Sequence, residues 1–268
     1  MLKHKILKLL MRLPDSEFEH YVQVDDRNSN VTLFTFAGAA GLFGMTPIFE
    51  FRRLLSERGG DYNLVFFRDL HSLCYHLDPQ GNPNGLEFFA NEIHHLIARL
   101  GSSYNVAIGN SAGAGAALYF GARCHLDQVI AFGAFLPERE DLKTRWRAIA
   151  DYRLLFQSPI AYTMGISGVN VHRKLRRSVG PQGIWPIVEM WQAETPLPKA
   201  VMYYGEGCEG DRLTAQQFCD TGHVECVALP TKSHGAARYL KSRGQLGSVI
   251  INHIHKGLAE RELKTMEA

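Results

Sequence analysis

The sequence predicts an α/β fold in which a mostly parallel central sheet is flanked by helices. The main observation is that short β-branched and aromatic runs alternate with longer segments of helical periodicity from about residue 20 to residue 258. The second is that glycines close the helical segments, as Gly59-Gly60 and Gly101 do. Strands that alternate with helices form parallel sheets covered on both faces. In such sheets the functional site lies at the carboxyl ends of the strands.

The expected elements follow in order along the chain. The first half supplies strands at 21–24, 31–36 and 62–67, helices at 48–58 and 86–100, and a loop at 68–84. The next part supplies a strand that begins at 105, a helix to 123 and a strand at 128–135. Residues 137–198 break this alternation, and we interpret them as a mostly helical insertion. The alternation resumes with strands at 199–204 and 224–229 and helices at 213–219 and 236–258, so we expect a single domain over residues 1–268.

Composition excludes several classes of function. A chain of 268 residues with 46% hydrophobic content buries a large core. A net charge of +2 gives no global argument for a nucleic-acid partner. The five cysteines form neither a CxxC pair nor a zinc spacing, which favours free thiols in a reducing compartment, and we expect the cytoplasm. No run approaches the roughly 18 apolar residues of a membrane span.

The N-terminal segment is not a signal peptide in this interpretation. Lys8 and Arg12 interrupt its apolar stretch, and no small-residue cleavage site follows. We expect a short amphipathic helix that ends at Pro14 and packs against the body of the protein, and docking to a membrane surface or a partner is its alternative role.

A Gly-x-Ser-x-Gly motif at 109–113 directly follows an expected strand and opens an expected helix. This is the pattern of a nucleophile elbow, a tight turn that presents a serine hydroxyl above a parallel sheet. Gly109 and Gly113 leave room for the turn, because a side chain at either position would crowd the neighbouring strand or helix. Ser111 is therefore the candidate nucleophile.

A serine nucleophile needs a base and a group that orients the base. His234 stands just beyond the last expected strand, where a base is expected. The strand that ends at Tyr204 leads into a loop with three carboxylates. Asp211, just before a helix, is the preferred acid, and an N-cap is its alternative role. The other candidates are Glu206, Glu209 and, more remotely, Glu138.

Acyl transfer also needs backbone N–H donors for the developing oxyanion. One is expected from Ala112, the residue after the nucleophile. The other is expected from the small-residue loop at 36–41, where Ala39 is the preferred donor and Ala40 the alternative.

These motifs together resemble the α/β-hydrolase superfamily over about residues 20–260. The resemblance is carried by Gly38-Ala39, the motif at 109–113, Asp211 and His234. It implies a serine hydrolase with an acyl-enzyme intermediate and a cap formed by residues 137–198. The loop at 36–41 is also similar to that of type II thioesterases, which act on carrier-bound acyl chains. The chain departs from the pattern at Asn110, where lipases and thioesterases commonly have histidine.

Four further residues are candidates for substrate binding. Arg68 ends a central strand beside Asp69 and forms either a structural ion pair or a substrate contact. Tyr75 is expected to line the pocket. Arg173 and Arg176 belong to a basic cluster that is either a solvated face or a receptor for an anionic substrate group, such as a phosphopantetheine or a nucleotide-sugar.

We therefore expect hydrolysis of an ester or thioester, on a small-molecule or carrier-bound acyl substrate. Neither a metal nor an organic cofactor is expected. The cysteines have no zinc spacing, and the chain lacks two motifs of nucleotide binding, a Gly-x-Gly-x-x-Gly motif at its first strand and a P-loop lysine. Two alternatives stay open. One is an acyltransferase that uses the same residues with a sugar or alcohol acceptor, and the other is a non-catalytic binding protein on a hydrolase fold.

Overall fold

The computed structural model describes residues 20–38, 49–58, 60–137, 170–193 and 196–267. The expected N-terminal helix, the first half of the insertion, and the alternatives Ala40 and Glu138 lie outside the described residues.

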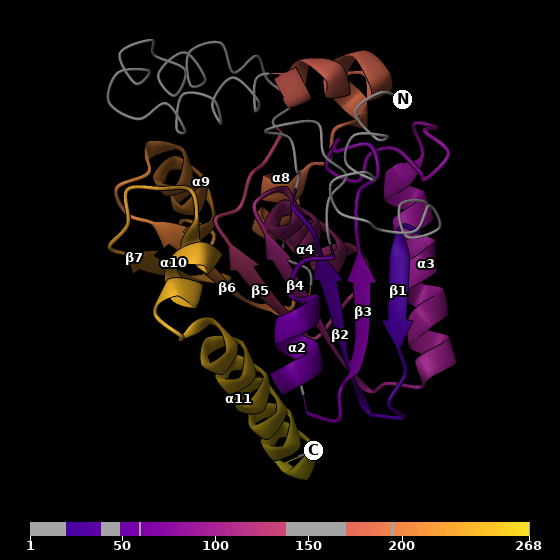
Figure 1. Cartoon of the computed structure of the whole chain (residues 1–268), viewed down its shortest axis with the longest axis vertical. Coiled ribbons are helices and arrows are strands. Elements are labelled where there is room, and N and C mark those ends of the chain that lie inside the picture. Colours follow the sequence, from indigo (N-terminus) through magenta and orange to yellow (C-terminus); the bar gives the residue numbers. More distant parts are fainter. Residues whose placement is uncertain (1–19, 39–48, 59, 138–169, 194–195, 268) are drawn as a thin grey trace, which may run out of the picture.

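A seven-stranded sheet forms the centre of the molecule, in the order β1-β3-β2-β4-β5-β6-β7 (Figure 1). Among the described strands, the β1–β3 pair is antiparallel, and every other pair of neighbours is parallel. The predicted fold class is confirmed. The strands are β1 Val22–Asp25, β2 Val31–Phe36, β3 Asn63–Phe67, β4 Tyr104–Asn110, β5 Gln128–Phe132, β6 Lys199–Gly205 and β7 Val224–Leu229.

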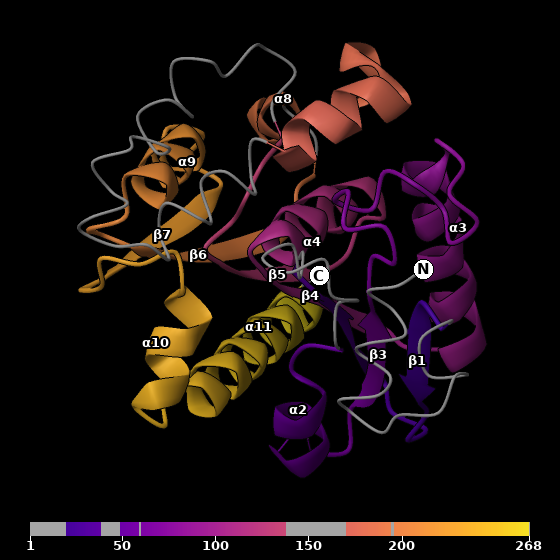
Figure 2. The same ribbon diagram turned by 45° about the horizontal axis from the view of Figure 1, so that its top comes forward.

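Helices cover both faces of the sheet, and each face has its own hydrophobic cluster (Figures 1 and 2). One face packs against α3 (Gly85–Leu100), α4 (Ala112–Arg123), α8 (Ile187–Gln192) and α9 (Glu209–Cys219). The other packs against α2 (Arg52–Arg58), α10 (Ala236–Ser242) and α11 (Leu246–Glu267). Alternate strand residues divide between the clusters: Leu33 faces one and Phe34 the other.

Several expected boundaries were wrong for local reasons. Helix α2 begins at Arg52 and not at 48, because Glu50 and Phe51 form a turn in which Phe51 has φ 63°. Strand β5 ends at Phe132, before Gly133 with φ 55°. The expected closing helix is divided into α10 and α11 around Gly244, which has φ 70°. Helix α9 begins at Glu209, four residues before the expected 213.

The described part of the insertion is helical. Residues 170–179 form a helix, followed by the 3₁₀ turn Pro181–Gly183 and then α8. Both views place the helix at 170–179 beyond the carboxyl ends of the parallel strands, at the top of Figure 1. That the insertion acts as a cap stays a prediction.

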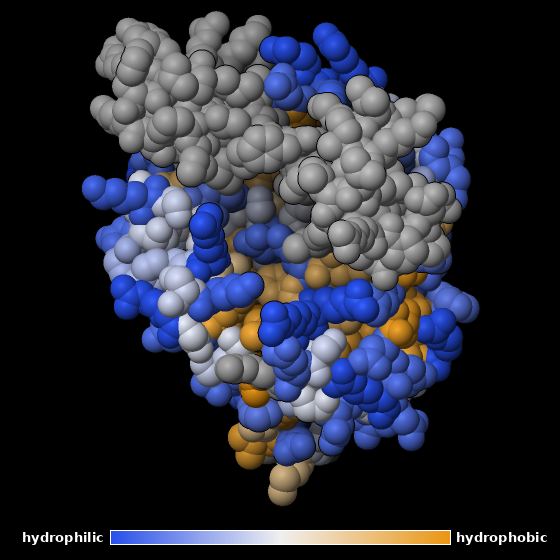
Figure 3. All heavy atoms as spheres, viewed as in Figure 1, coloured by the Kyte–Doolittle hydropathy of each residue, from blue (hydrophilic) through white to orange (hydrophobic). Residues whose placement is uncertain are grey.

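Hydrophilic residues cover most of the described surface in the view of Figure 3, with smaller apolar patches near its centre and right side. Among the described helices, none combines the length and the apolar character that crossing a bilayer requires.

Candidate active site

Ser111 lies between β4 and α4 in a strained backbone conformation, with φ 56° and ψ −121°. A positive φ is rare for a residue with a side chain and persists only where the surroundings hold it. Here the Ser111 N–H donates to the carbonyl of Phe132 at 2.9 Å, and the Ser111 carbonyl accepts from the N–H of Phe135 at 3.0 Å. The turn is therefore tied to the end of the neighbouring strand β5.

Both glycines of the motif are required by close backbone approach. A Cβ at Gly109 would overlap the carbonyl oxygen of Gly113, and a Cβ at Gly113 would overlap that of Phe36. The first overlap would separate β4 from α4, and the second would separate α4 from the end of β2. These contacts have the geometry of a nucleophile elbow.

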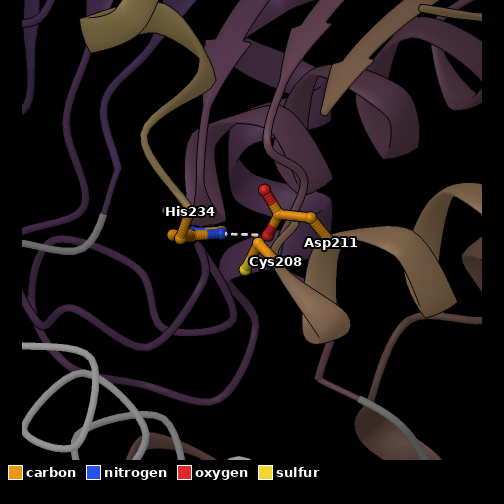
Figure 4. A group of neighbouring side chains, drawn as sticks. All are labelled: Cys208, Asp211 and His234. Atoms are coloured by element: carbon orange, nitrogen blue, oxygen red, sulfur yellow. Dashed lines mark hydrogen bonds and ion pairs between the residues drawn. The ribbon is translucent and has the colours of Figure 1, made fainter. Parts of the chain in front are cut away.

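Three candidate residues from distant parts of the chain form one hydrogen-bonded line. Ser111 Oγ lies 2.8 Å from His234 Nε2. His234 Nδ1 is hydrogen-bonded to Asp211 Oδ1, and Figure 4 shows these two side chains pointing toward each other. Because a carboxylate accepts only, Nδ1 carries the proton and Nε2 is left to accept from the serine hydroxyl. The structure thus brings together Ser111, His234 and Asp211.

The loop after β6 offers three carboxylates, and the geometry separates them. Asp211 is 3% exposed, and its second oxygen accepts from the N–H of Gly205 at 3.3 Å. Glu206 is exposed, and Glu209 is exposed and paired with Arg212 at 2.9 Å. The early start of α9 places Asp211 in its first turn, where the helix faces His234. Among the described carboxylates, Asp211 is the one that meets the histidine.

Burial and the contact with Asp211 shift the pKa of His234 in opposite directions. Burial lowers the pKa of His234, but the charge of Asp211 and its hydrogen bond raise it, and the net shift is upward from 6.5. The imidazolium that forms when the histidine takes a proton is therefore stabilised by the buried carboxylate.

Cys208, Asp211 and His234 also lie close enough to be considered as metal ligands, with their ligand atoms within 4.8 Å of one another (Figure 4). A metal needs a thiolate and a free imidazole lone pair. Burial and the nearby Asp211 raise the pKa of the Cys208 thiol to about 12, which keeps it protonated. The Nδ1 atom of His234 is already hydrogen-bonded to Asp211. The donor set fits a histidine–carboxylate pair better than a metal centre.

The expected oxyanion donors lie on two sides of the elbow. Ala112 is the first residue of α4, and N–H groups of a first helical turn have no partner within the helix. Ala39 lies outside the described residues. Its neighbour Gly38 packs on the elbow, since a Cβ at Gly38 would lie 3.3 Å from Ser111 Cβ and 2.8 Å from the carbonyl oxygen of Asn110. The loop after β2 therefore touches the nucleophile strand.

Glu50 is a polar residue of this region that sequence reasoning missed. Its carboxylate accepts from the N–H of Gly38 at 3.1 Å and from Asn110 Nδ2 at 3.2 Å. Burial raises the pKa of Glu50, and these two hydrogen bonds offset part of that increase. The one sequence signal was Asn110 in place of the common histidine.

Tyr75 and Arg68 make structural contacts in this region. Tyr75 is fully buried, and its hydroxyl donates to the carbonyl oxygens of Ala37 at 3.0 Å and Phe67 at 3.3 Å. It therefore lies beneath the loop after β2 and not on an open surface. Arg68 is 5% exposed, donates to the carbonyl of His20, and places its guanidinium 4.5 Å from the ring centre of Phe49.

Arg173 and Arg176 lie in the helix at 170–179, with Arg173 exposed and Arg176 partly exposed. A buried histidine anchors the neighbouring part of the insertion: His76 Nε2 accepts from the N–H of Trp185 at 3.2 Å. Burial lowers the pKa of His76 to about 4, so it stays neutral and can accept this bond. The insertion is thus held to the loop after β3.

Comparison with solved structures places this architecture among known folds. MenH from S. aureus superposes with a TM-score of 0.55 at 10% identity, over 89% of this chain and 99% of that one. A carboxylesterase of Nitrososphaera gargenis superposes with a TM-score of 0.54 at 12% identity, over 90% and 95%. The chain has the α/β-hydrolase fold.

Structures with this fold differ in activity. The capsule O-acetyltransferase of Neisseria meningitidis serogroup A matches with a TM-score of 0.52 at 12% identity, over 86% of this chain and 90% of that one. Neither a protein-family model nor a curated protein matches the sequence. The α/β-hydrolase fold thus includes esterases and acyltransferases, and the choice between them depends on the site.

Proposed function

We propose that the protein is a serine hydrolase that cleaves an ester or thioester through an acyl-enzyme intermediate. The observation that carries the proposal is the hydrogen-bonded line Ser111–His234–Asp211 at a strained elbow. A side-chain arrangement of this kind recurs on unrelated folds for the same chemistry, which makes it a stronger argument than the fold.

The reaction follows from the roles of the three side chains. Ser111 Oγ attacks the acyl carbon while His234 Nε2 takes the hydroxyl proton. Asp211 holds the imidazole tautomer and stabilises its charge. The N–H groups of Ala112 and Ala39 are the proposed donors to the oxyanion. His234 then returns the proton to the leaving oxygen or sulfur, and the acyl group stays on Ser111.

The second half of the reaction uses the same groups. His234 removes a proton from a water molecule, whose oxygen attacks the acyl carbon. The Ser111 oxygen leaves, recovers the proton from His234, and the free acid departs. Each half of the reaction leaves His234 neutral, and the second half restores the hydroxyl of Ser111.

A panel of p-nitrophenyl esters and acyl thioesters of increasing chain length tests this proposal. We expect turnover by the unmodified protein and a loss of at least about 10⁴-fold in kcat for Ser111→Ala. Ser242→Ala, the same change at an exposed position at the end of α10, is the control and keeps turnover within a few-fold. Full esterase activity in Ser111→Ala would disprove the assignment.

An acyltransferase is the second candidate, supported by the fold match to an O-acetyltransferase. In that reaction the hydroxyl of a sugar or alcohol replaces water in the second half. Product analysis separates the two: free acid indicates hydrolysis, and a new ester indicates transfer. A folded protein that produces neither favours the binding-protein alternative.

The basic helix at 170–179 is proposed to receive an anionic part of the substrate, because it lies on the same side as the strand ends (Figures 1 and 2). Reversing Arg173 and Arg176 to glutamate is expected to raise KM for acyl-CoA thioesters and leave neutral esters unchanged. Lys241→Glu with Lys256→Glu, on exposed positions of α10 and α11, is the matched control. Unchanged turnover of the anionic substrates would refute this assignment.

A further inference from the structure

One carboxylate outside the triad connects two parts of the proposed active site. Glu50 Oε2 accepts from the N–H of Gly38 at 3.1 Å, in the loop after β2. Glu50 Oε1 accepts from Asn110 Nδ2 at 3.2 Å, on the residue directly before Ser111. The carboxylate therefore joins the loop of the proposed oxyanion donor Ala39 to the strand that carries the proposed nucleophile.

The peptide group between Ala37 and Gly38 is hydrogen-bonded at both of its ends. Its carbonyl oxygen accepts from the Tyr75 hydroxyl at 3.0 Å, and its N–H donates to Glu50. A peptide group is planar, and its carbonyl and N–H point in opposite directions. The two bonds therefore restrict rotation of the whole unit, and the next residue in the chain is Ala39.

The turn that presents Glu50 is itself strained. Phe51 follows it with φ 63°, an unusual conformation for a bulky residue. The Phe51 ring packs against Phe132, with ring centres 6.0 Å apart, and its carbonyl accepts from the N–H of Leu55 at 2.8 Å. Strained residues persist where their surroundings determine them and gather near functional sites. The packing of this turn holds Glu50 in place.

We propose that Glu50 is a positioning residue that fixes the Ala37–Gly38 peptide group against the strand of Ser111 by binding Gly38 and Asn110 at once. This inference rests on the proposed function. Both partners are N–H donors, and the carboxylate meets this requirement by accepting from each with a separate oxygen. The same requirement explains the asparagine at 110, because its amide supplies the donor.

An exchange of the two side chains tests the pairing. Glu50→Gln turns an N–H₂ group toward one of the two donors, and we expect kcat to fall about 10- to 100-fold with little change in KM. Asn110→Asp sets two carboxylates against each other and should cause a similar loss. In the double variant the amide at 50 accepts from Gly38 and donates to the carboxylate at 110. We expect its kcat to return to within about 3-fold of the unmodified protein.

The matched control is Glu57→Gln, which removes an exposed carboxylate of α2 that pairs with Arg53 at 3.0 Å. It should leave kcat unchanged. Losses that add in the double variant, or a kcat of Glu50→Gln within about 2-fold of the unmodified protein, would overturn the proposal.

Amide hydrogen exchange at Gly38 provides a second readout that needs no turnover. Exchange should be slow in the unmodified protein, faster in Glu50→Gln, and slow again in the double variant. If the unmodified protein hydrolyses no substrate, the proposed function fails, and this exchange pattern still decides whether Glu50 holds the loop.

Thermal unfolding of each variant separates a positioning effect from loss of the fold. Should Glu50→Gln not fold, Asn110→Ala takes its place, because it removes one partner and adds no repulsion. Faster exchange at Gly38 in Asn110→Ala supports the proposal, and exchange equal to that of the unmodified protein contradicts it.

Discussion

Two corners of the proposed site are built in different ways: Ser111, His234 and Asp211 form the triad corner, and Ala37 and Gly38, next to the proposed oxyanion donor, form the oxyanion corner. The triad corner takes its side chains from segments that follow three parallel strands: Ser111 from the turn after β4, Asp211 from the first turn of α9 after β6, and His234 from the loop after β7. The oxyanion corner takes its shape from backbone groups of Ala37 and Gly38, held by side chains of Tyr75 and Glu50. Side chains that react come from strand ends, whereas side chains that hold a backbone come from wherever the fold brings a partner.

The largest effect is expected at the acid of the triad corner. Asp211→Asn keeps the size of the side chain but lets the imidazole adopt the wrong tautomer, and we expect kcat to fall about 10⁴-fold. Glu206→Gln and Glu209→Gln are the controls, since both carboxylates are exposed, and each should keep kcat within about 3-fold. Steady-state kinetics on one ester decides it. A comparable loss of kcat in either control would assign the role of the triad acid to that residue instead.

The next effect is on the free energy of unfolding, at the contact between α4 and the end of β2. Gly113→Ala places a methyl group onto the carbonyl oxygen of Phe36, a backbone atom that cannot move aside. We expect the free energy of unfolding to fall by about 3–5 kcal/mol. Gly244→Ala is the control, because a Cβ added there has no described atom within 4 Å. Its loss of stability is limited to the strain of a positive φ, about 1 kcal/mol. Urea unfolding of both variants measures the difference, and equal losses would contradict the close approach.

A smaller effect is expected at the oxyanion corner. Tyr75→Phe removes the hydroxyl that donates to Ala37 and Phe67, while the ring stays in its aromatic cluster. We expect a loss of about 1 kcal/mol in stability and a several-fold drop in kcat, with KM nearly constant. Combined kinetics and urea unfolding check this, and an unchanged kcat would confine Tyr75 to a structural role.

The smallest effect is a shift in pH dependence. His234 must be neutral to act as a base, and its pKa is raised above 6.5 by Asp211, which outweighs the lowering by burial. Activity is therefore lost as pH falls through this raised pKa, so the acid limb of kcat/KM should have its midpoint above 6.5. In Asp211→Asn the midpoint should move down, because burial then acts without the opposing charge. A midpoint that does not move would contradict the raising of the His234 pKa by Asp211.

The two corners also differ in how far the sequence could predict them. The fold class and the meeting of Ser111, Asp211 and His234 were predictable, because alternating strands and helices define where strand ends lie. The choice of Asp211 over Glu206 and Glu209 depended on where α9 begins, and that boundary was placed four residues too late.

The contacts of Glu50 could not be predicted. Its partners lie 12 and 60 residues away along the chain. One of them is a backbone N–H, which leaves no trace in the residue types. The turn at Glu50 and Phe51 was also expected to be helical, because the apolar spacing continues through it. The positive φ of Phe51 depends instead on packing against Phe132, which the sequence does not reveal. Contacts of this kind appear only in three dimensions.

Covalent labelling is the most direct test of whether Ser111 is a nucleophile activated by His234. The protein is incubated with a fluorophosphonate, and the adduct is located by mass spectrometry of its peptides. We expect one adduct on Ser111, absent in Ser111→Ala and formed much more slowly in His234→Ala. A folded protein that stays unlabelled, or an adduct on another residue, would contradict it.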